Sequence, residues 1–470
     1  MNTPAPSRSK SLPAGWVKAP VGKLFQVLGG GTPPTSRTEF WTGGIPWISS
    51  ADIGEDHKIT PRRKITKAAI SASATNLVPA GSAIVVTRVG LGKVGLAEQD
   101  LCFSQDNHAL IFDRNRFDSK FVVLQMGQLV SVFKCISRGT TINGVTKKQL
   151  LDVEFLAPPL PEQRRIVAEI EKQFARLEVG VAALRRLQVN LKRYRAAVLK
   201  AACEGRLVPT EAELTKTGNR KTNFETGKAL LARTLIERRQ NWQGRGQYKE
   251  PAFPDTANLL PLPEGWAWAR AEQLCEFITK GTTPAAEKMR AGEGEVPFIK
   301  VYNLTFTGVL NLDYKPVFIS RKTHELELTR SEVRTGDILI NIVGPPLGQV
   351  AIIPTTIKEA NINQAIARFR VVLPECQRLL ALYLRTEQII GWAMKSAKTT
   401  AGQSNITLEL CRDLPVPLPP LAEQTRIVAE VERRLSVLEE LEAAVSANLQ
   451  RATHLRQSIL QQAFAGRLTL

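Results

Sequence analysis

A fourteen-residue stretch occurs twice in this chain, and this repeat constrains the fold more than any other feature of the sequence. PPLPEQRRIVAEIE occupies positions 158–171 and PPLAEQTRIVAEVE occupies positions 419–432, with eleven of the fourteen positions identical. Each copy opens a long charged segment that closes on Gly-Arg-Leu, at 205–207 and at 466–468. Such a repeat indicates a tandem duplication, so each half is expected to fold as a version of one unit.

The segments that follow the two copies predict long coiled-coil helices. Apolar residues recur at alternating steps of four and three from Ile170 to Val198, and again from Val431 to Ala463. That spacing is typical of the seam of a coiled coil. Gln188 and Arg195 also fall on seam positions, which favours a specific partner helix over an extended zipper. The two helices can pair with each other within one chain, and an antiparallel pair would relate the two halves by a pseudo-two-fold axis.

The segment before each helix predicts a strand-rich domain. Short apolar runs such as Ile45–Ile48 and His108–Asp113 lie between Gly, Pro, Asn and Asp residues, which is typical of strands and turns. A helix is predicted from Ser119 to Lys134, with Asp118 as its N-cap. The start of the first domain, LPAGW at 12–16, returns as LPEGW at 262–266.

The fold class predicted is therefore α+β, with two β-rich domains joined by two long antiparallel coiled-coil helices in a pseudo-two-fold tandem repeat. Residues 209–257 have no counterpart in the second half and form an insert. Within it, 209–223 is polar and expected to be loose, whereas 229–242 is expected to be helical. The expected boundaries are a disordered N-terminus at 1–11, a first β-rich domain at 12–155, a first long helix at 156–208, an insert at 209–257, a second β-rich domain at 258–415 and a second long helix at 416–470.

The charge of the chain indicates a polyanionic partner. The formal net charge is +19, and nucleic acid is the commonest partner of so basic a protein, followed by anionic membranes. No apolar run approaches the roughly 20 residues that a membrane span needs, so a membrane partner is not expected. Residues 1–155 hold 19 Lys and Arg against 11 Asp and Glu, whereas 258–415 hold 18 against 16. Double-stranded DNA is the expected partner, with more phosphate contacts in the first domain.

No metal or catalytic site is predicted. The six cysteines are scattered without a Cys-x-x-Cys pair and the four histidines are isolated, which is typical of a cytoplasmic protein without a zinc site. Gly90–Gly95 matches the spacing of a dinucleotide or S-adenosylmethionine loop, but no crossover helix follows, and a hairpin turn is favoured. Asp113, Asp118 and Lys120 imitate a nuclease site, yet an N-cap role explains Asp118.

Polar and basic loops of the two domains are the candidate DNA contacts, because their side chains reach phosphates and base edges. The densest basic cluster is 58–67, and the loops at 138–148 and 398–407 are related by the repeat. The candidates of the first domain are Ser49, Ser50, Lys58, Arg62, Arg63, Lys64, Lys67, Arg88, Lys93, Arg138, Thr140, Thr141, Asn143 and Lys147. The candidates of the second domain are Lys280, Lys300, Tyr302, Asn303, Asn341, Gln349, Lys398, Gln403, Ser404 and Asn405.

Two modules that start L-P-x-G-W, each followed by the Pro-Leu-x-Glu-Gln turn and a long helix ending in Gly-Arg-Leu, resemble the specificity subunit of type I restriction-modification systems. The resemblance covers residues 12–470. It implies a non-catalytic DNA-binding subunit whose two target-recognition domains each read one half of a bipartite asymmetric site. The helices would set the spacing of the halves. Two alternatives stay open from the residues alone, namely a stand-alone DNA-modifying enzyme and a coiled-coil assembly protein with incidental charge.

The resemblance also implies partners. Two methyltransferase subunits would dock on the helices, and restriction subunits, which are ATP-dependent translocases and nucleases, would join them. S-adenosylmethionine, ATP and magnesium are expected on these partner subunits, with none bound by this chain. By the resemblance, the residues expected at the docking surfaces are Glu162, Gln163, Arg165, Glu423, Gln424 and Arg426.

Overall fold

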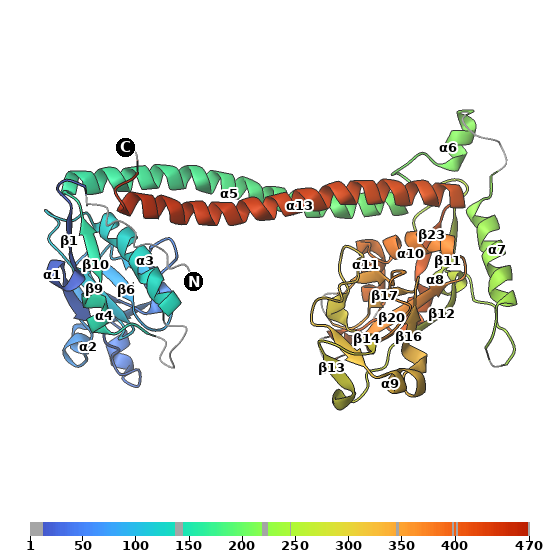
Figure 1. The fold of residues 1–470 in the computed structure, drawn as a ribbon, viewed down its shortest axis with the longest axis horizontal. Coiled ribbons are helices and arrows are strands. Elements are labelled where there is room, and N and C mark those ends of the chain that lie inside the picture. Colours follow the sequence, from blue (N-terminus) through green and yellow to red (C-terminus); the bar gives the residue numbers. More distant parts are fainter. Residues whose placement is uncertain are drawn as a thin grey trace, which may run out of the picture. The chain divides into compact units, whose positions relative to one another are not determined.

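The computed structural model describes residues 13–136, 144–218, 224–244, 246–344, 347–396, 399–400 and 403–468. The chain divides into two compact units (Figure 1). Unit 1 comprises 1–186 and 445–470, and unit 2 comprises 187–444. The predicted disordered N-terminus at 1–11 lies outside the described residues. Two 44-residue helices, α5 (Leu160–Cys203) and α13 (Leu421–Phe464), contribute a segment to each unit, as the repeat predicts.

Unit 1 is built on two four-stranded sheets. One is antiparallel with the order β2-β9-β6-β7, and the other has the order β4-β3-β8-β5, with β3 and β8 parallel. The elements of unit 1 are β1 (Val17–Pro20), α1 (Val21–Leu24), β2 (Gln26–Gly29), η1 (Thr38–Trp41), β3 (Ile45–Ile48), η2 (Ser50–Asp52), β4 (Arg63–Ile65), α2 (Lys67–Ser71), β5 (Leu77–Val78), β6 (Ala83–Val86), β7 (Val94–Leu96), β8 (Leu101–Phe103), β9 (Asn107–Ile111), α3 (Ser119–Ile136), α4 (Lys147–Leu151) and β10 (Glu154–Ala157). The predicted helix after Asp118 is confirmed, since the Phe121 amide donates to Asp118 Oδ1 at 3.0 Å.

Unit 2 repeats this plan with an additional strand. Its sheets have the orders β12-β20-β17-β18 and β13-β15-β14-β19-β16, with β14 and β19 parallel. The elements of unit 2 are α6 (Glu211–Lys216), α7 (Gly227–Gln240), β11 (Ala267–Arg270), α8 (Ala271–Leu274), β12 (Cys275–Lys280), η4 (Ala286–Lys288), β13 (Met289–Ala291), β14 (Val296–Ile299), η5 (Val301–Asn303), β15 (Val317–Ile319), α9 (Arg321–Leu326), η6 (Thr329–Ser331), β16 (Glu332–Arg334), β17 (Ile338–Asn341), β18 (Val350–Ile352), β19 (Glu359–Ile362), β20 (Ile366–Val371), η7 (Pro374–Cys376), α10 (Gln377–Tyr383), α11 (Glu387–Ser396), β21 (Thr399–Thr400), β22 (Gln403–Ser404), α12 (Leu408–Asp413) and β23 (Pro415–Leu418). The parallel strand pair recurs in both units, which supports the duplication.

A buried tryptophan fastens each domain to the start of a long helix. In unit 1 the Trp16 indole donates to Glu162 Oε1 at 3.0 Å. In unit 2 the Trp266 indole donates to Glu423 Oε1, also at 3.0 Å. The four residues are the repeat-related Trp of L-P-x-G-W and Glu of the Glu-Gln turn. One hydrogen bond therefore links the two most similar motifs of each half.

The end of the other long helix reaches the same tryptophan. Gly466 follows α13 and lies against Pro13 and Trp16, whereas Gly205 follows α5 and lies against Trp266. Both glycines have a positive φ, +65° and +66°, which a residue with a Cβ rarely adopts. Since the start of one helix meets the end of the other in each unit, the helices run antiparallel, as predicted.

The predicted polar seam position Arg195 has a specific partner. Its guanidinium pairs with Glu442 of α13 at 3.0 Å, and only 15% of the side chain is exposed. In unit 1 the Arg456 guanidinium lies 4.4 Å from the centre of the Phe174 ring. Arg195 also lies 3.9 Å from Glu439 of α13, so two carboxylates on successive turns of α13 hold this polar seam position.

The insert differs from the sequence-based expectation in one respect. Residues 209–223 were expected to be loose, but Glu211–Lys216 form α6. Thr210 and Glu213 form a capping box, with the Thr210 side chain accepting from the Glu213 amide. The S/T-x-x-E pattern that marks such a start is present in the sequence at Thr210. The helix predicted at 229–242 is confirmed as α7, Gly227–Gln240.

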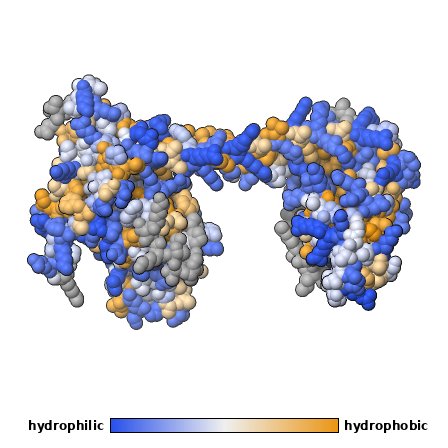
Figure 2. Space-filling view, turned by 180° about the vertical axis from the view of Figure 1, so that it is seen from behind, coloured by the Kyte–Doolittle hydropathy of each residue, from blue (hydrophilic) through white to orange (hydrophobic). Residues whose placement is uncertain are grey.

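Among the described residues, no helix is long and apolar enough to cross a membrane. On the face shown in Figure 2, hydrophilic and hydrophobic side chains are interspersed over both units.

We predict that the two tryptophan hydrogen bonds differ in strength. Trp266→Phe leaves the fully buried Glu423 carboxylate short of a donor, which costs about 1–3 kcal/mol. Trp16→Phe is the matched control and should cost less, because Glu162 is half-exposed and water replaces the indole. Thermal unfolding followed by circular dichroism should therefore show a larger drop in Tm for Trp266→Phe. Equal drops would contradict the assignment.

Candidate nucleic-acid interface

Three loops that the sequence analysis singled out come together in unit 1. They are the Ser49–Asp52 turn after β3, the β6–β7 turn, and the segment that leads into α4. A Cβ on Gly90 would lie 3.8 Å from Ser50, so the first two loops are adjacent. The Val145 amide donates to the Thr87 carbonyl at 2.7 Å, which brings the third loop alongside.

Positive charge is concentrated where these loops meet. Arg88 and Lys147 are exposed on neighbouring loops. Half-buried His108 lies beneath them, with its Nδ1 3.0 Å from Thr87 Oγ1. Burial, Lys147 and Arg88 together lower the pKa of His108, so the imidazole is neutral at pH 7. Neither Arg88 nor Lys147 forms an ion pair with another described residue, and phosphate oxygens would complement their charge.

A second part of the basic surface lies on residues 58–67, a segment that includes β4 and ends at the first residue of α2. Asp52 positions it, since Asp52 accepts from Ser49 Oγ at 2.8 Å and pairs with Arg62 at 3.4 Å. The Arg63 guanidinium stacks 5.3 Å from the Trp41 ring centre. The remaining candidates of this segment are exposed, namely Lys58, Lys64 and Lys67. Lys93 has a structural contact, as its Nζ donates to the Ile53 carbonyl at 3.0 Å.

Unit 2 brings the equivalent loops together. The Ile406 amide donates to the Ile342 carbonyl at 2.9 Å, and Gln349 Nε2 donates to the Leu304 carbonyl at 3.1 Å. These bonds join the turn after β17 to the segment before α12 and to η5. The same three-loop arrangement is therefore built twice on the duplicated scaffold.

The chemistry of the unit 2 loops is different. Tyr302 packs edge-on against Tyr314 with ring centres 5.8 Å apart, and Lys315 Nζ lies 5.2 Å from the Tyr314 ring centre. Phe306 and Val309 are exposed nearby in sequence. Tyr314, Phe306 and Lys315 are not among the predicted contacts, because nothing in their spacing shows that the 304–315 loop folds back onto η5. Aromatic and apolar groups here would suit base edges better than phosphates.

Two of the predicted DNA contacts in unit 2 are buried and hydrogen-bonded within the domain. Asn303 and Asn341 are 2% and 1% exposed, so neither side chain is free to reach a ligand. Asn303 Nδ2 donates to the Asn311 and Tyr314 carbonyls at 2.9 and 3.0 Å. Asn341 Oδ1 accepts from the Val343 amide at 3.1 Å. Short amide side chains satisfy loop backbone as readily as they read bases, and here they shape the loops.

The other candidates are placed as follows. Ser50 is 9% exposed and Ser49 caps η2, so both are largely structural. Lys280 ends β12 and is exposed, whereas Lys300 and Asn405 are half-exposed. Several candidates lie outside the described residues, either entirely or in their side chains, and stay predictions: Arg138, Thr140, Thr141, Asn143, Lys398, Gln403 and Ser404.

The predicted docking residues need a correction. Gln163, Glu423 and Gln424 are 0–1% exposed and contact this chain. Gln163 Nε2 donates to the Arg116 and Pro158 carbonyls at 3.0 and 2.8 Å, and Gln424 Nε2 donates to Pro419 at 2.9 Å. The glutamines hold the proline turn against the helix start, so they do not present a surface. Arg165 is exposed and Glu162 and Arg426 are partly exposed.

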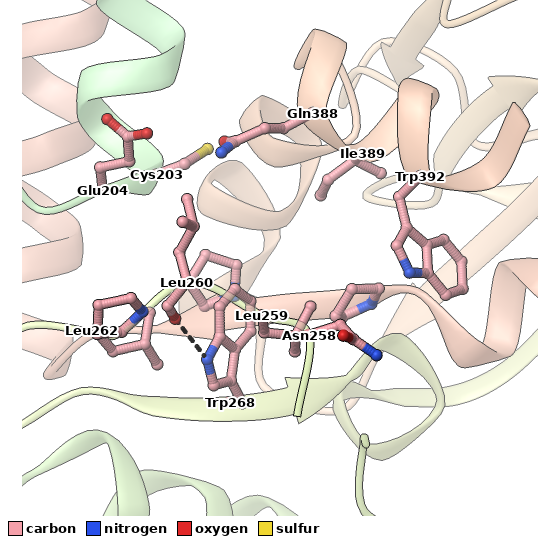
Figure 3. A pocket seen from close by; sticks show the side chains of 13 residues that line it. Cys203, Glu204, Asn258, Leu259, Leu260, Leu262, Trp268, Gln388, Ile389 and Trp392 are labelled. Carbon is pink, nitrogen blue, oxygen red and sulfur yellow. Dashed lines mark hydrogen bonds between the residues drawn. The ribbon is translucent and has the colours of Figure 1, made fainter. Parts of the chain in front are cut away.

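Unit 2 also contains an apolar pocket of about 190 Å³. Figure 3 shows Cys203, Gln388 and Ile389 facing Leu260 and Trp268, whose indole donates to the Leu260 carbonyl at 3.3 Å. Burial raises the pKa of the Cys203 thiol, which makes it a poor nucleophile. The lining is otherwise Leu, Pro and Trp with Asn258 and Glu204, so it offers no acid–base pair for catalysis.

The turn at Gly90–Gly95 is a hairpin, as predicted. It joins β6 and β7, which pair antiparallel, and Gly90 and Gly92 have φ of +86° and +95°. Among the described residues, no group of three or more His, Cys, Asp or Glu side chains is placed to hold a metal.

Comparisons with known proteins agree on one family. The profile of the type I restriction modification DNA specificity domain matches residues 13–180 and 263–451. The EcoBI specificity subunit of a type I restriction enzyme of Escherichia coli is 26% identical over 362 residues, which are 76% of this chain and 67% of that protein. The EcoDI specificity subunit, also from Escherichia coli, is 25% identical over 332 residues, covering 71% of this chain and 66% of that protein. The chain spans about two thirds of the length of these relatives.

The fold agrees as well. A solved structure that concerns complex assembly and conformational transition of the type I R-M system covers 98% of this chain and 100% of its own, with a TM-score of 0.65 and 20% identity. At that identity the likeness shows the fold alone. The two profile matches fall on the two repeat halves and together cover well over half of the sequence. The chain therefore belongs to the family of type I restriction-modification DNA specificity subunits.

Proposed function

We propose that this chain recognises one bipartite, asymmetric DNA sequence, with unit 1 reading one half and unit 2 the other. The observation that carries the proposal is the three-loop surface, which is built twice on one scaffold but with different side chains. The family supports DNA sequence recognition. Equal scaffolds would give equivalent placement on DNA, and unlike loops would give unlike half-sites. The paired long helices would set the spacing between the halves.

The two surfaces contribute unequally in this proposal. In unit 1 the exposed cations Lys58, Lys64, Lys67, Arg88 and Lys147 would contact phosphates and supply most of the affinity. In unit 2 the Tyr302 and Tyr314 rings would make apolar contacts with bases, including the methyl group of thymine. The net charge of +8 on 1–155, from 19 Lys and Arg against 11 Asp and Glu, agrees with that division.

The chemistry is proposed to belong to partners. Two methyltransferase subunits would dock on this chain and bind S-adenosylmethionine, and restriction subunits would supply ATP- and magnesium-dependent cleavage. This chain would bind none of the three and would act as a non-catalytic subunit. The scattered cysteines, five of which are free and buried, agree with the cytoplasm as the place of action.

We predict that Arg88 and Lys147 each contribute one phosphate contact. The double variant Arg88→Ala, Lys147→Ala should bind the target duplex about tenfold more weakly at 0.1 M salt. It should also reduce the slope of log K against log salt by about 1.8, since each phosphate contact contributes about 0.9. Fluorescence anisotropy over a salt series measures both. Lys322→Ala, an exposed lysine of α9, is the control, and an unchanged slope in the double variant would refute the assignment.

We predict that recognition is modular. Replacing residues 12–155 by the corresponding domain of a relative should change one half of the methylated sequence and leave the other half intact. The reciprocal exchange of 258–415 is the matched control and should change the opposite half. Methylome sequencing of cells that express each chimaera with its partner reads out both halves. A change in both halves after one exchange would overturn the proposal.

A further inference from the structure

The insert covers the corner of unit 2 where α13 begins. The Glu211 amide donates to Glu423 Oε2 at 3.0 Å, and the Glu211 carboxylate pairs with the Arg426 guanidinium. Arg426 also donates to the Pro209 carbonyl at 3.0 Å. Glu211 is 1% exposed, so its carboxylate is buried at this corner. Burial raises the pKa of Glu423, and the Trp266 indole and the Glu211 amide oppose that rise by stabilising its charged form.

The insert also covers the adjoining face of unit 2. The Phe224 ring would lie 3.1 Å from a Cβ on Gly265, and the Gly227 amide donates to the Gly265 carbonyl at 2.7 Å. A Cβ on Gly227 would meet the Leu418 carbonyl, so α7 starts in close contact with β23. Figure 1 shows α7 beside β11 and α8. The described parts of this segment, residues 209–218 and 224–231, therefore cover one corner and one face of unit 2.

The same corner in unit 1 has no such cover among the described residues. Glu162 and Arg165 correspond to Glu423 and Arg426 in the repeat, three residues apart on one helix face. Glu162 accepts the Trp16 indole through Oε1, as Glu423 accepts Trp266. Arg165 is exposed, and no described residue forms an ion pair with it. Glu162 Oε2 and the Arg165 guanidinium are thus available to a ligand.

The adjoining face of unit 1 is also not covered by any of the residues that the structure describes. A pocket of about 310 Å³ lies where Phe224 and the start of α7 lie in unit 2. Gly15 of this pocket corresponds to Gly265, and Pro159 corresponds to Pro420. Val17, which corresponds to Ala267, is 55% exposed. Gly15, Val17, Pro159, Glu162 and Arg165 define what we call the open face.

We infer that the open face of unit 1 is the docking site for a segment of a partner subunit that has the chemistry of residues 209–231. Such a segment carries a carboxylate for Arg165, a backbone amide for Glu162 and an aromatic side chain for the pocket. The partner's identity rests on the proposed function, which assigns methyltransferase subunits, whereas the site itself rests on the repeat. A carboxylate of the partner would form a charge-assisted pair with the exposed Arg165 guanidinium, and the pocket would bury the apolar surface of the aromatic side chain.

One consequence concerns the two partner copies. The near-identical helices suggest equivalent docking, but in unit 2 the corresponding face is already filled by the insert. A partner on that side would contact the outer surface of α6 and α7 instead. The two copies would therefore bind unlike surfaces of this chain.

A synthetic peptide of residues 209–231 tests the inference on the full-length chain. Labelled at its C-terminus, it should bind saturably with one peptide per chain in fluorescence anisotropy. Arg165→Glu should weaken binding at least tenfold, as should Glu211→Lys in the peptide. Arg426→Glu in the chain is the matched control, and should lower Tm by unpairing buried Glu211 while leaving peptide affinity unchanged. Circular dichroism verifies that Arg165→Glu, an exposed position, folds normally.

Three outcomes would overturn the inference. They are no saturable binding up to 1 mM peptide, binding that Arg165→Glu leaves unchanged, and binding that Arg426→Glu abolishes, which would show exchange with the insert in unit 2. The peptide should also compete with the methyltransferase subunit for the chain. Because peptide binding is measured without DNA or partner, its result stands even if the chain shows no sequence preference, so the two proposals fail separately.

Discussion

The hydrogen bond from a tryptophan indole to a glutamate carboxylate underlies the architecture of both units. It ties the start of a β-rich domain to the start of a long helix, and the end of the other helix packs on the same indole. We call this meeting point of a tryptophan with the start of one helix and the end of the other a corner. Each helix takes part in two corners, so the length and the register of the helices are coupled. An additional turn in one helix would move a Gly-Arg-Leu tail away from its tryptophan. Arg195 and Glu442 reinforce that register along the seam.

This coupling explains why the two halves agree most closely at the corners where a tryptophan meets the two helices. The corners need Trp, Glu, Gln and Gly at fixed places, so the two halves agree there. The three loops of each domain are held by backbone hydrogen bonds, such as Val145 to Thr87 and Ile406 to Ile342, which place few demands on side chains. One scaffold can therefore present cations in unit 1 and tyrosines in unit 2. The side chains on the loops differ between the two units, whereas the scaffold that positions the loops is the same.

The sequence predicted the frame well because its signals are periodic or local. Heptad spacing indicated α5 and α13, an N-cap indicated α3, and the repeat indicated two related units. Prediction from the sequence was less successful where one residue type serves two roles. Asn303 and Asn341 have the chemistry of base contacts, but folding turns them onto backbone groups. Gln163 and Gln424 likewise cap the proline turns. Which role an amide takes depends on burial, and burial of a loop is not local information.

The repeat also misleads in one way, because similar helices need not present similar surfaces. Glu423 and Arg426 match Glu162 and Arg165 in sequence. Glu211 binds both Glu423 and Arg426, whereas no described residue takes the place of Glu211 beside Glu162 and Arg165. A buried carboxylate is stable only when paired and hydrogen-bonded, so Glu211 would not occupy its corner unless Arg426 and Glu423 were there to receive it. The side chains of Glu423 and Arg426 therefore bind an acidic segment in unit 2. The duplication places the same two residue types, Glu162 and Arg165, at the surface of unit 1.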